Sequence, residues 1–213
     1  MNARLKEIYS NLPECDVFAD IGCDHGYMTL MMLKGDKCKR AIISDVSKKC
    51  LSKAENLLQD YVDEGRVESV VSDGFDNVPP CDEALIAGMG GEEIISIIER
   101  AKSLPENLIL QPMKNTDKVR VASLKAGYRV VKDYVFFNDG KFYDLLVLKK
   151  GEDSLTEEEI NFGRTNVIER GSAFKAQLRQ KIEKYKVYLS QDNLSEQVKT
   201  DMLSEISKME NYV

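Results

Sequence analysis

The residues best suited to chemistry lie in one short stretch, Ala19–Tyr27, which reads Ala-Asp-Ile-Gly-Cys-Asp-His-Gly-Tyr. It follows Val17–Ala19, the end of a buried strand, and it precedes the apolar face of a helix at Tyr27–Leu33. Gly22 and Gly26 lie in the turn between strand and helix. Two glycines let a ligand approach the backbone and the free N–H groups of a helix start. We therefore predict a ligand-binding turn.

Asp20 narrows the choice of ligand. A carboxylate at the end of the strand is unfavourable beside a pyrophosphate, but it suits a cationic or hydroxyl-bearing ligand. The spacing Asp-x-Gly-x-Asp-x-Gly also differs from the Gly-x-Gly-x-x-Gly fingerprint of dinucleotide-binding proteins. Both observations favour S-adenosylmethionine (SAM) over a dinucleotide as the cofactor.

Strands and helices alternate around this turn, which predicts an α/β protein with a doubly wound sheet. Further strands are expected at 40–46, 67–73, 83–87 and 107–112, and helices at 1–14, 47–64, 91–98 and 116–125. The pattern changes at Tyr128–Phe137 and Phe142–Leu148, two strands that are joined by Asn138-Asp-Gly-Lys141, a hairpin signal. A sheet closed by a reversed strand is typical of SAM-dependent methyltransferases.

The carboxyl ends of the strands supply further candidates, because ligands bind there in sheets of this kind. Asp45 can accept both hydroxyls of a ribose, and Asp73 can accept the amino group of adenine. Simpler interpretations also exist. Each aspartate can be a helix cap or a turn residue, the glycines near 88 can form a flexible turn, and Met89 can be a packing residue. The cofactor-binding residues that we expect are Asp20, Gly22, Asp45, Val46, Asp73, Gly74, Gly88, Met89 and Gly90.

The composition is that of a folded, soluble protein. The 213 residues are 43% hydrophobic and 31% charged, and no apolar run approaches the roughly 20 residues that span a membrane. Five scattered cysteines, never in a Cys-x-x-Cys pair, and the lack of a secretory signal indicate the reducing cytoplasm. A single histidine and no close cysteine pair leave no recognisable metal site.

A second unit is expected to follow Gly151, where β-branched runs end and polar residues dominate. We therefore predict a cofactor-binding domain at 1–151 and a helical domain at 152–213. Ser154 is expected to cap a helix, and two longer helices at 173–189 and 194–211, separated by residues 190–193, to form an antiparallel hairpin. Its apolar contacts are expected from Phe174, Leu178, Ile182, Tyr185, Leu189, Val198, Met202, Leu203, Ile206 and Met209.

The helical domain carries a basic segment in a protein whose net charge is −6. Residues 164–186 contain seven basic and two acidic side chains, a local balance of +5. Such a segment can hold a phosphate backbone, although a solvated helix face gives the same pattern. Its candidate RNA-binding residues include Arg164, Arg170, Lys175 and Arg179.

Three segments together closely resemble the TrmK family: Ala19–Tyr27, then Ile-Ala-Gly-Met-Gly-Gly at 86–91, then Leu-Ile-Leu-Gln-Pro at 108–112. Members are bacterial tRNA (adenine-22-N1)-methyltransferases with a Rossmann-like SAM domain and a coiled-coil-like helical domain. The resemblance implies that Asp24 and His25 lie near the reacting centre. This sequence differs from the family pattern at Met113, where members often have Asn directly after Gln-Pro. Asn115 follows two residues later.

The chemistry implied by this resemblance needs little from the protein except alignment. N1 of adenine is unprotonated near neutral pH, so catalysis relies on positioning. We expect Asp24 to accept a hydrogen bond from the exocyclic amine, and Tyr27, Gly91, Gln111 and Pro112 to lie on the substrate side. Two alternatives remain: a methyltransferase of a small molecule or protein whose tail serves dimerisation, and a non-catalytic RNA-binding module that retains SAM. We expect a monomer that binds tRNA but neither membranes nor metals.

Overall fold

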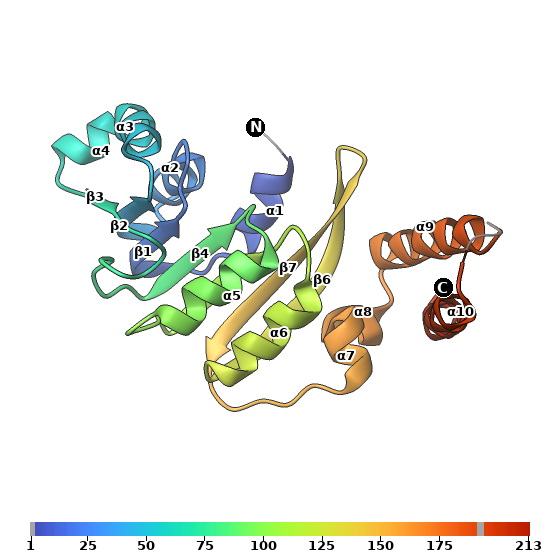
Figure 1. Cartoon of the computed structure of the whole chain (residues 1–213). Helices are drawn as coiled ribbons and strands as arrows, with labels where there is room; N and C mark the ends of the chain where they lie inside the picture. The colour runs from blue at the N-terminus through green and yellow to red at the C-terminus, as the bar shows by residue number, and fades with distance from the viewer. Residues whose placement is uncertain (1–2, 191–193) are drawn as a thin grey trace.

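The computed structural model describes residues 3–190 and 194–213, and it contains a seven-stranded sheet of order β3-β2-β1-β4-β5-β7-β6 (Figure 1). The first five strands are parallel, and β7 pairs antiparallel with both β5 and β6. This topology confirms the predicted doubly wound sheet closed by a hairpin. The strands are β1 (Cys15–Ile21), β2 (Cys38–Asp45), β3 (Val67–Val71), β4 (Glu83–Ala87), β5 (Asn107–Gln111), β6 (Tyr128–Asn138) and β7 (Lys141–Lys150).

Helices cover both faces of the sheet. Consecutive residues of a strand point to opposite faces, so Phe18 and Ile43 belong to one core and Ala19 and Ile42 to the other. The first core lies under α1 (Ala3–Asn11), α2 (Tyr27–Lys34) and α3 (Lys48–Leu57), and the second under α5 (Gly91–Arg100) and α6 (Thr116–Lys125). Burial on both faces explains why the parallel strands read as continuous apolar runs.

Several element boundaries differ from the prediction, and two of these differences have a clear physical cause. The helix expected at 47–64 is divided at Leu58 into α3 and α4 (Gln59–Asp63), and Leu58 itself is fully buried. The third strand ends at Val71 and not at Asp73, because the Ser72 hydroxyl donates to the Gly74 carbonyl and accepts from the Asn77 N–H. The side chain of Ser72 thus starts a turn that ends the strand.

The C-terminal part contains α7 (Glu157–Phe162), α8 (Arg164–Glu169), α9 (Ser172–Leu189) and α10 (Glu196–Glu210). The helix cap expected at Ser154 is Thr156, which forms a capping box with Glu159, and α8 was not predicted. Two of the expected apolar contacts are wrong, since Leu203 is 57% exposed and Val198 is 39% exposed. Residues 191–193 of the expected connection lie outside the described residues. The buried contacts between α9 and α10 come from Phe174, Leu178, Ile182, Ile206 and Met209.

The segment that follows β7 returns along the outer edge of β6. The side chain of Asp153 accepts from the Val130 N–H, Thr165 from the Asp133 N–H, and Asn166 from the Val135 N–H. The edge of a sheet exposes unpaired N–H groups, and these three side chains satisfy three of them. The start of the C-terminal part is therefore attached to the sheet by hydrogen bonds as well as by apolar packing.

Candidate functional site

The site expected from the sequence lies where the order of the strands reverses, between β1 and β4. The loops that follow these two strands touch: a Cβ atom on Gly22 would lie 2.1 Å from Cε of Met89. Gly22 also has a φ angle of +73°, which side chains other than glycine rarely adopt. The φ angle requires glycine at this position, and the flexible end of the Met89 side chain occupies the space where a Cβ atom would lie.

Asp24 lies at the tip of the turn with a φ angle of 47°. Its N–H donates to Oδ2 of Asp45 at 3.3 Å, and its own Oδ2 lies 2.7 Å from Nδ1 of His25. The His25 ring stacks on Tyr27 with centroids 5.7 Å apart. All three side chains are accessible to a large substrate: that of Asp24 is 65% exposed, that of His25 42%, and Tyr27 as a residue 53%.

Asp20 is the buried acid of the site. Its carboxylate accepts a hydrogen bond from Thr29 Oγ1 at 2.9 Å, and burial raises its pKa to about 6. The carboxylate of Asp45 accepts the Ser47 N–H through Oδ1 in addition to the Asp24 N–H through Oδ2. Asp45 therefore organises the turn, as a cap residue does, and each oxygen keeps a lone pair for a further donor.

The other predicted cofactor residues lie around the same edge. Asp73 pairs with Arg100 at 2.9 Å, and a Cβ atom on Gly74 would lie 2.7 Å from Ile97. Val46 follows β2 and is 68% exposed. Val46, Asp73 and Gly74 thus follow the carboxyl ends of parallel strands, as the topology requires.

A hydrogen-bonded unit connects the loops that follow β4 and β5. The Gly88 N–H donates to the Gln111 carbonyl, and the Met113 N–H donates to the Met89 carbonyl. The buried Gln111 accepts from Nε of Arg4 at 2.8 Å and donates to the Pro112 carbonyl. The side-chain amide of Gln111 is thus fixed by hydrogen bonds at both its oxygen and its nitrogen.

Arg4 was missed by sequence reasoning. It precedes the buried Ile8 by four residues, and this spacing places both on one face of α1.

Two further predictions concern the neighbouring loop. Gly91 is packed against the backbone, since its N–H donates to the Lys114 carbonyl. Met113 is 50% exposed, and the Asn115 amide donates to Glu92, so Asn115 is engaged elsewhere.

The basic residues of the C-terminal part divide into two groups. Arg164 is engaged inside the protein, with two contacts of 2.9 Å to Asp153 and one of 3.1 Å to Glu159, and the Arg170 guanidinium lies over the Tyr212 ring. Lys175 and Arg179 lie on α9, where Arg179 is exposed. The internal pairing of Arg164 reduces the positive charge that this segment offers to a ligand.

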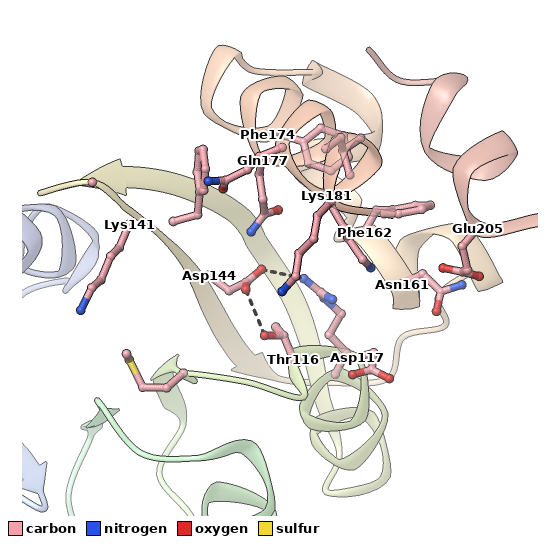
Figure 2. A pocket seen from close by; sticks show the side chains of 17 residues that line it. Thr116, Asp117, Lys141, Asp144, Asn161, Phe162, Phe174, Gln177, Lys181 and Glu205 are labelled. Carbon is pink, nitrogen blue, oxygen red and sulfur yellow. Dashed lines mark hydrogen bonds and ion pairs between the residues drawn. The ribbon is translucent and has the colours of Figure 1, made fainter. Parts of the chain in front are cut away.

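A cleft of about 970 Å³ separates the β6–β7 hairpin and α6 from α9 (Figure 2). We call it the hairpin cleft; its walls include Met113, Lys141, Phe142, Gln177, Lys181 and Lys184. Arg120 lies at its base, with Nε donating to Asp133 at 2.6 Å and Nη1 to the Ile160 carbonyl at 2.8 Å. Met113 joins this cleft to the loops described above.

Within residues 3–190 and 194–213, no three His, Cys, Asp or Glu side chains are grouped as a metal site requires. No helix in the described part of the chain has both the length and the apolar character needed to cross a membrane.

Comparison with known proteins gives matches over the whole fold. M. capricolum TrmK, solved with S-adenosyl-homocysteine, is 22% identical with a TM-score of 0.89, over 100% of this chain and 97% of that one. Sp1610 of Streptococcus pneumoniae, solved with S-adenosyl-L-methionine, is also 22% identical with a TM-score of 0.89, over 100% and 99%. At these identities the two structures establish the fold, and they agree with the predicted Rossmann-like sheet and helical tail.

Sequence comparison identifies the family. The tRNA (adenine(22)-N(1))-methyltransferase of Bacillus subtilis is 28% identical over 157 residues, which are 71% of this chain and 66% of that protein. The family model of TrmK, tRNA (adenine(22)-N(1))-methyltransferase, matches residues 18–211. The match confirms the resemblance seen in the three motifs, and the chain belongs to the TrmK family.

Proposed function

We propose that this protein transfers a methyl group from SAM to N1 of adenine 22 in tRNA. The observation that carries the proposal is the turn between β1 and α2, from which Asp24, His25 and Tyr27 project beside Gly22 and Met89. The family's description names this reaction, and the relatives solved with SAM or S-adenosyl-homocysteine share the fold. The protein acts as a monomer in the cytoplasm.

The residues of the switch point fit SAM. The buried carboxylate of Asp20 suits a cationic ligand, because a positive charge nearby offsets the cost of ionising a buried acid. The free lone pairs of Asp45 suit the ribose hydroxyls, and Asp73 with Gly74 lies on the adenine side. Gly22, Gly88 and Gly90 let the ligand approach the backbone, with Met89 and Val46 beside it.

The chain orients the acceptor. Bound SAM supplies an electrophilic methyl group, and N1 of adenine accepts it without first losing a proton. Asp24 accepts a hydrogen bond from the exocyclic amine and favours the positive charge that develops on the ring. His25 fixes the Asp24 carboxylate through the 2.7 Å contact, and Tyr27 offers an exposed ring to the base. Gly91, Gln111 and Pro112 are buried, so they support the substrate side of the same edge from beneath it.

The two parts of the chain divide the work. Residues 1–151 hold SAM and the target base, while residues 152–213 hold the RNA backbone through basic side chains such as Arg170, Lys175 and Arg179. Arg164 contributes by fixing α8 to the sheet through Asp153. A base inside a folded tRNA must leave its stack to reach the turn.

The test is methylation of tRNA that lacks this modification, with the modified nucleotide mapped by mass spectrometry. We expect one methyl group on N1 of adenine 22. Transfer to a protein or small molecule with none to tRNA would refute the proposal. SAM and tRNA binding with no methyl transfer would leave the non-catalytic module as the correct reading.

A further inference from the structure

The β6–β7 hairpin extends beyond the edge of the sheet on which the candidate site lies. β7 runs antiparallel to β5 and pairs Leu146 with Leu110, so the end of β5 lies near Leu145. The residues at 141–144 and their partners on β6 therefore project past β5 by roughly 13 Å, at about 3.3 Å per residue. Figure 1 shows this projection as the free end of the hairpin, between α1 and α9.

The two faces of the projecting end differ. Phe136 and Tyr143 stack with centroids 5.4 Å apart and belong to the core under α1, where Tyr134 is hydrogen-bonded to Asn11. The opposite face carries Phe137 and Phe142, with centroids 4.9 Å apart. Phe137 is 56% exposed. Contacts with α1 therefore fix one face of the hairpin. On its other face Phe137 is exposed, and Phe142 beside it is partly buried against the C-terminal core.

This aromatic pair borders the basic end of the hairpin cleft. Lys141 and Phe142 lie on one wall, and Lys181 and Lys184 lie on the other, on α9. Among the described residues these three lysines form no ion pair, and Asp144, an acid on the hairpin wall, pairs with Arg120. Figure 2 shows Glu205, another acid of the cleft, at the end opposite Lys141.

An exposed aromatic ring beside ammonium groups that form no ion pair is a recognisable surface for single-stranded nucleic acid. Bases stack on such rings without sequence preference, and the cations hold the phosphates. Met113 connects this surface to the loop after β4 through its N–H bond to Met89. Met113 thus places this surface beside the loops that follow β4 and β5.

We propose that Phe137, supported by Phe142, stacks on a nucleotide adjacent to the target adenine, and that Lys141 and Lys181 hold the phosphates of that strand. This inference rests on the proposed function. The aromatic ring takes the place of the target base in the RNA stack while that base occupies the turn. Phe137 is thus a positioning residue that acts on the substrate before methyl transfer.

The test compares Phe137→Ala with Phe137→Trp and with Val131→Ala, using tRNA and saturating SAM. Val131 is a matched control, because it is an exposed apolar residue of the same strand, at 52% exposure, far from the hairpin tip. We expect Phe137→Ala to lower kcat/KM for tRNA at least about 5-fold, the lower limit for losing one aromatic–base stack. Phe137→Trp should restore activity, and Val131→Ala should have the activity of the wild type. The KM for SAM and the melting temperature should be unchanged in all three variants.

A second readout uses tRNA with 2-aminopurine in place of adenine 22. Binding of the wild-type protein should raise its fluorescence as the base leaves the stack, and Phe137→Ala should reduce this rise at saturating protein. Equal kinetics and fluorescence for Phe137→Ala and Val131→Ala would overturn the inference, as would a change only in self-association. Absence of methyl transfer to tRNA by the wild-type protein would instead refute the proposed function.

Discussion

The backbone N–H of Asp24 donates to the side chain of Asp45 at 3.3 Å, which links the exposed tip of the first turn to the carboxylate at the end of the second strand. Asp45 is the residue assigned to the cofactor ribose, and Asp24 is the residue assigned to the target base. A ligand that orders Asp45 therefore orders the backbone of Asp24 as well. The link predicts that SAM binding prepares the acceptor side of the site.

Asp24→Asn should lower kcat/KM for tRNA by about 100-fold, because an amide cannot replace the negative charge beside the developing positive charge. Asparagine tolerates the φ angle of 47°, so the fold should be unchanged. Asp36→Asn is the matched control, since Asp36 is also an exposed aspartate at a positive φ angle, 51°. Steady-state kinetics test the prediction, and equal activity of the two variants would remove Asp24 from the mechanism.

Gly22→Ala should weaken SAM binding and lower the free energy of unfolding by about 1–3 kcal/mol, since it combines backbone strain with a clash against Met89. Gly127→Ala separates the two causes, because its φ angle is +79° but no atom lies within 4 Å of the added Cβ. Calorimetric titration with SAM and thermal unfolding provide the measurements. Gly127→Ala should lose stability without losing SAM affinity; similar losses of affinity in both would contradict the assignment of Gly22.

Glu83 predicts a pH dependence of stability. It is fully buried at the start of β4 with no hydrogen-bond partner for either oxygen in the described residues, and burial raises its pKa to about 8. The folded state therefore holds this proton more tightly than the unfolded chain does. The contribution of Glu83 to stability is complete below about pH 4.5, declines above it and is lost as the pH rises through about 8.

Replacing Glu83 removes this dependence. Glu83→Gln should be more stable than the wild type at pH 9 by several kcal/mol, since one pKa unit corresponds to about 1.4 kcal/mol. Urea unfolding at pH 5, 7 and 9 measures the effect. Glu68→Gln, an exposed strand position, should follow the wild type at each pH. A constant difference between Glu83→Gln and the wild type across these pH values would show that Glu83 does not titrate in the folded protein.

Arg120→Leu should lower the free energy of unfolding by about 3–5 kcal/mol, because it leaves the Asp133 carboxylate buried without a counter-charge. It also removes the hydrogen bond to the Ile160 carbonyl, which joins α6 to α7. The double variant Arg120→Leu/Asp133→Leu should recover part of this loss. Chemical denaturation measures both, and a double variant that is less stable than the single one would show that charge burial is not the main cause.

The sequence was sufficient to predict the parallel strands and the ligand-binding turn, because apolar runs and glycines act locally. It was insufficient where distant residues meet. Arg120 and Asp133 are 13 positions apart, and Arg4 and Gln111 are 107 apart, so no local pattern reveals either contact. Arg164 contributed to the basic balance of the tail, yet in the fold it pairs with Asp153. Its charge could not be assigned before its neighbours were known.

The hydrogen bonds from Asp153, Thr165 and Asn166 to β6 determine how the chain can be shortened. A protein cut after Gly151 would present a bare strand to its own copies, and intermolecular strand addition would follow. Loss of tRNA binding in such a fragment would then reflect self-association and not a missing RNA contact. A cut after Arg170 keeps the three acceptors in place, so this fragment keeps the edge of β6 covered while it lacks Lys175 and Arg179.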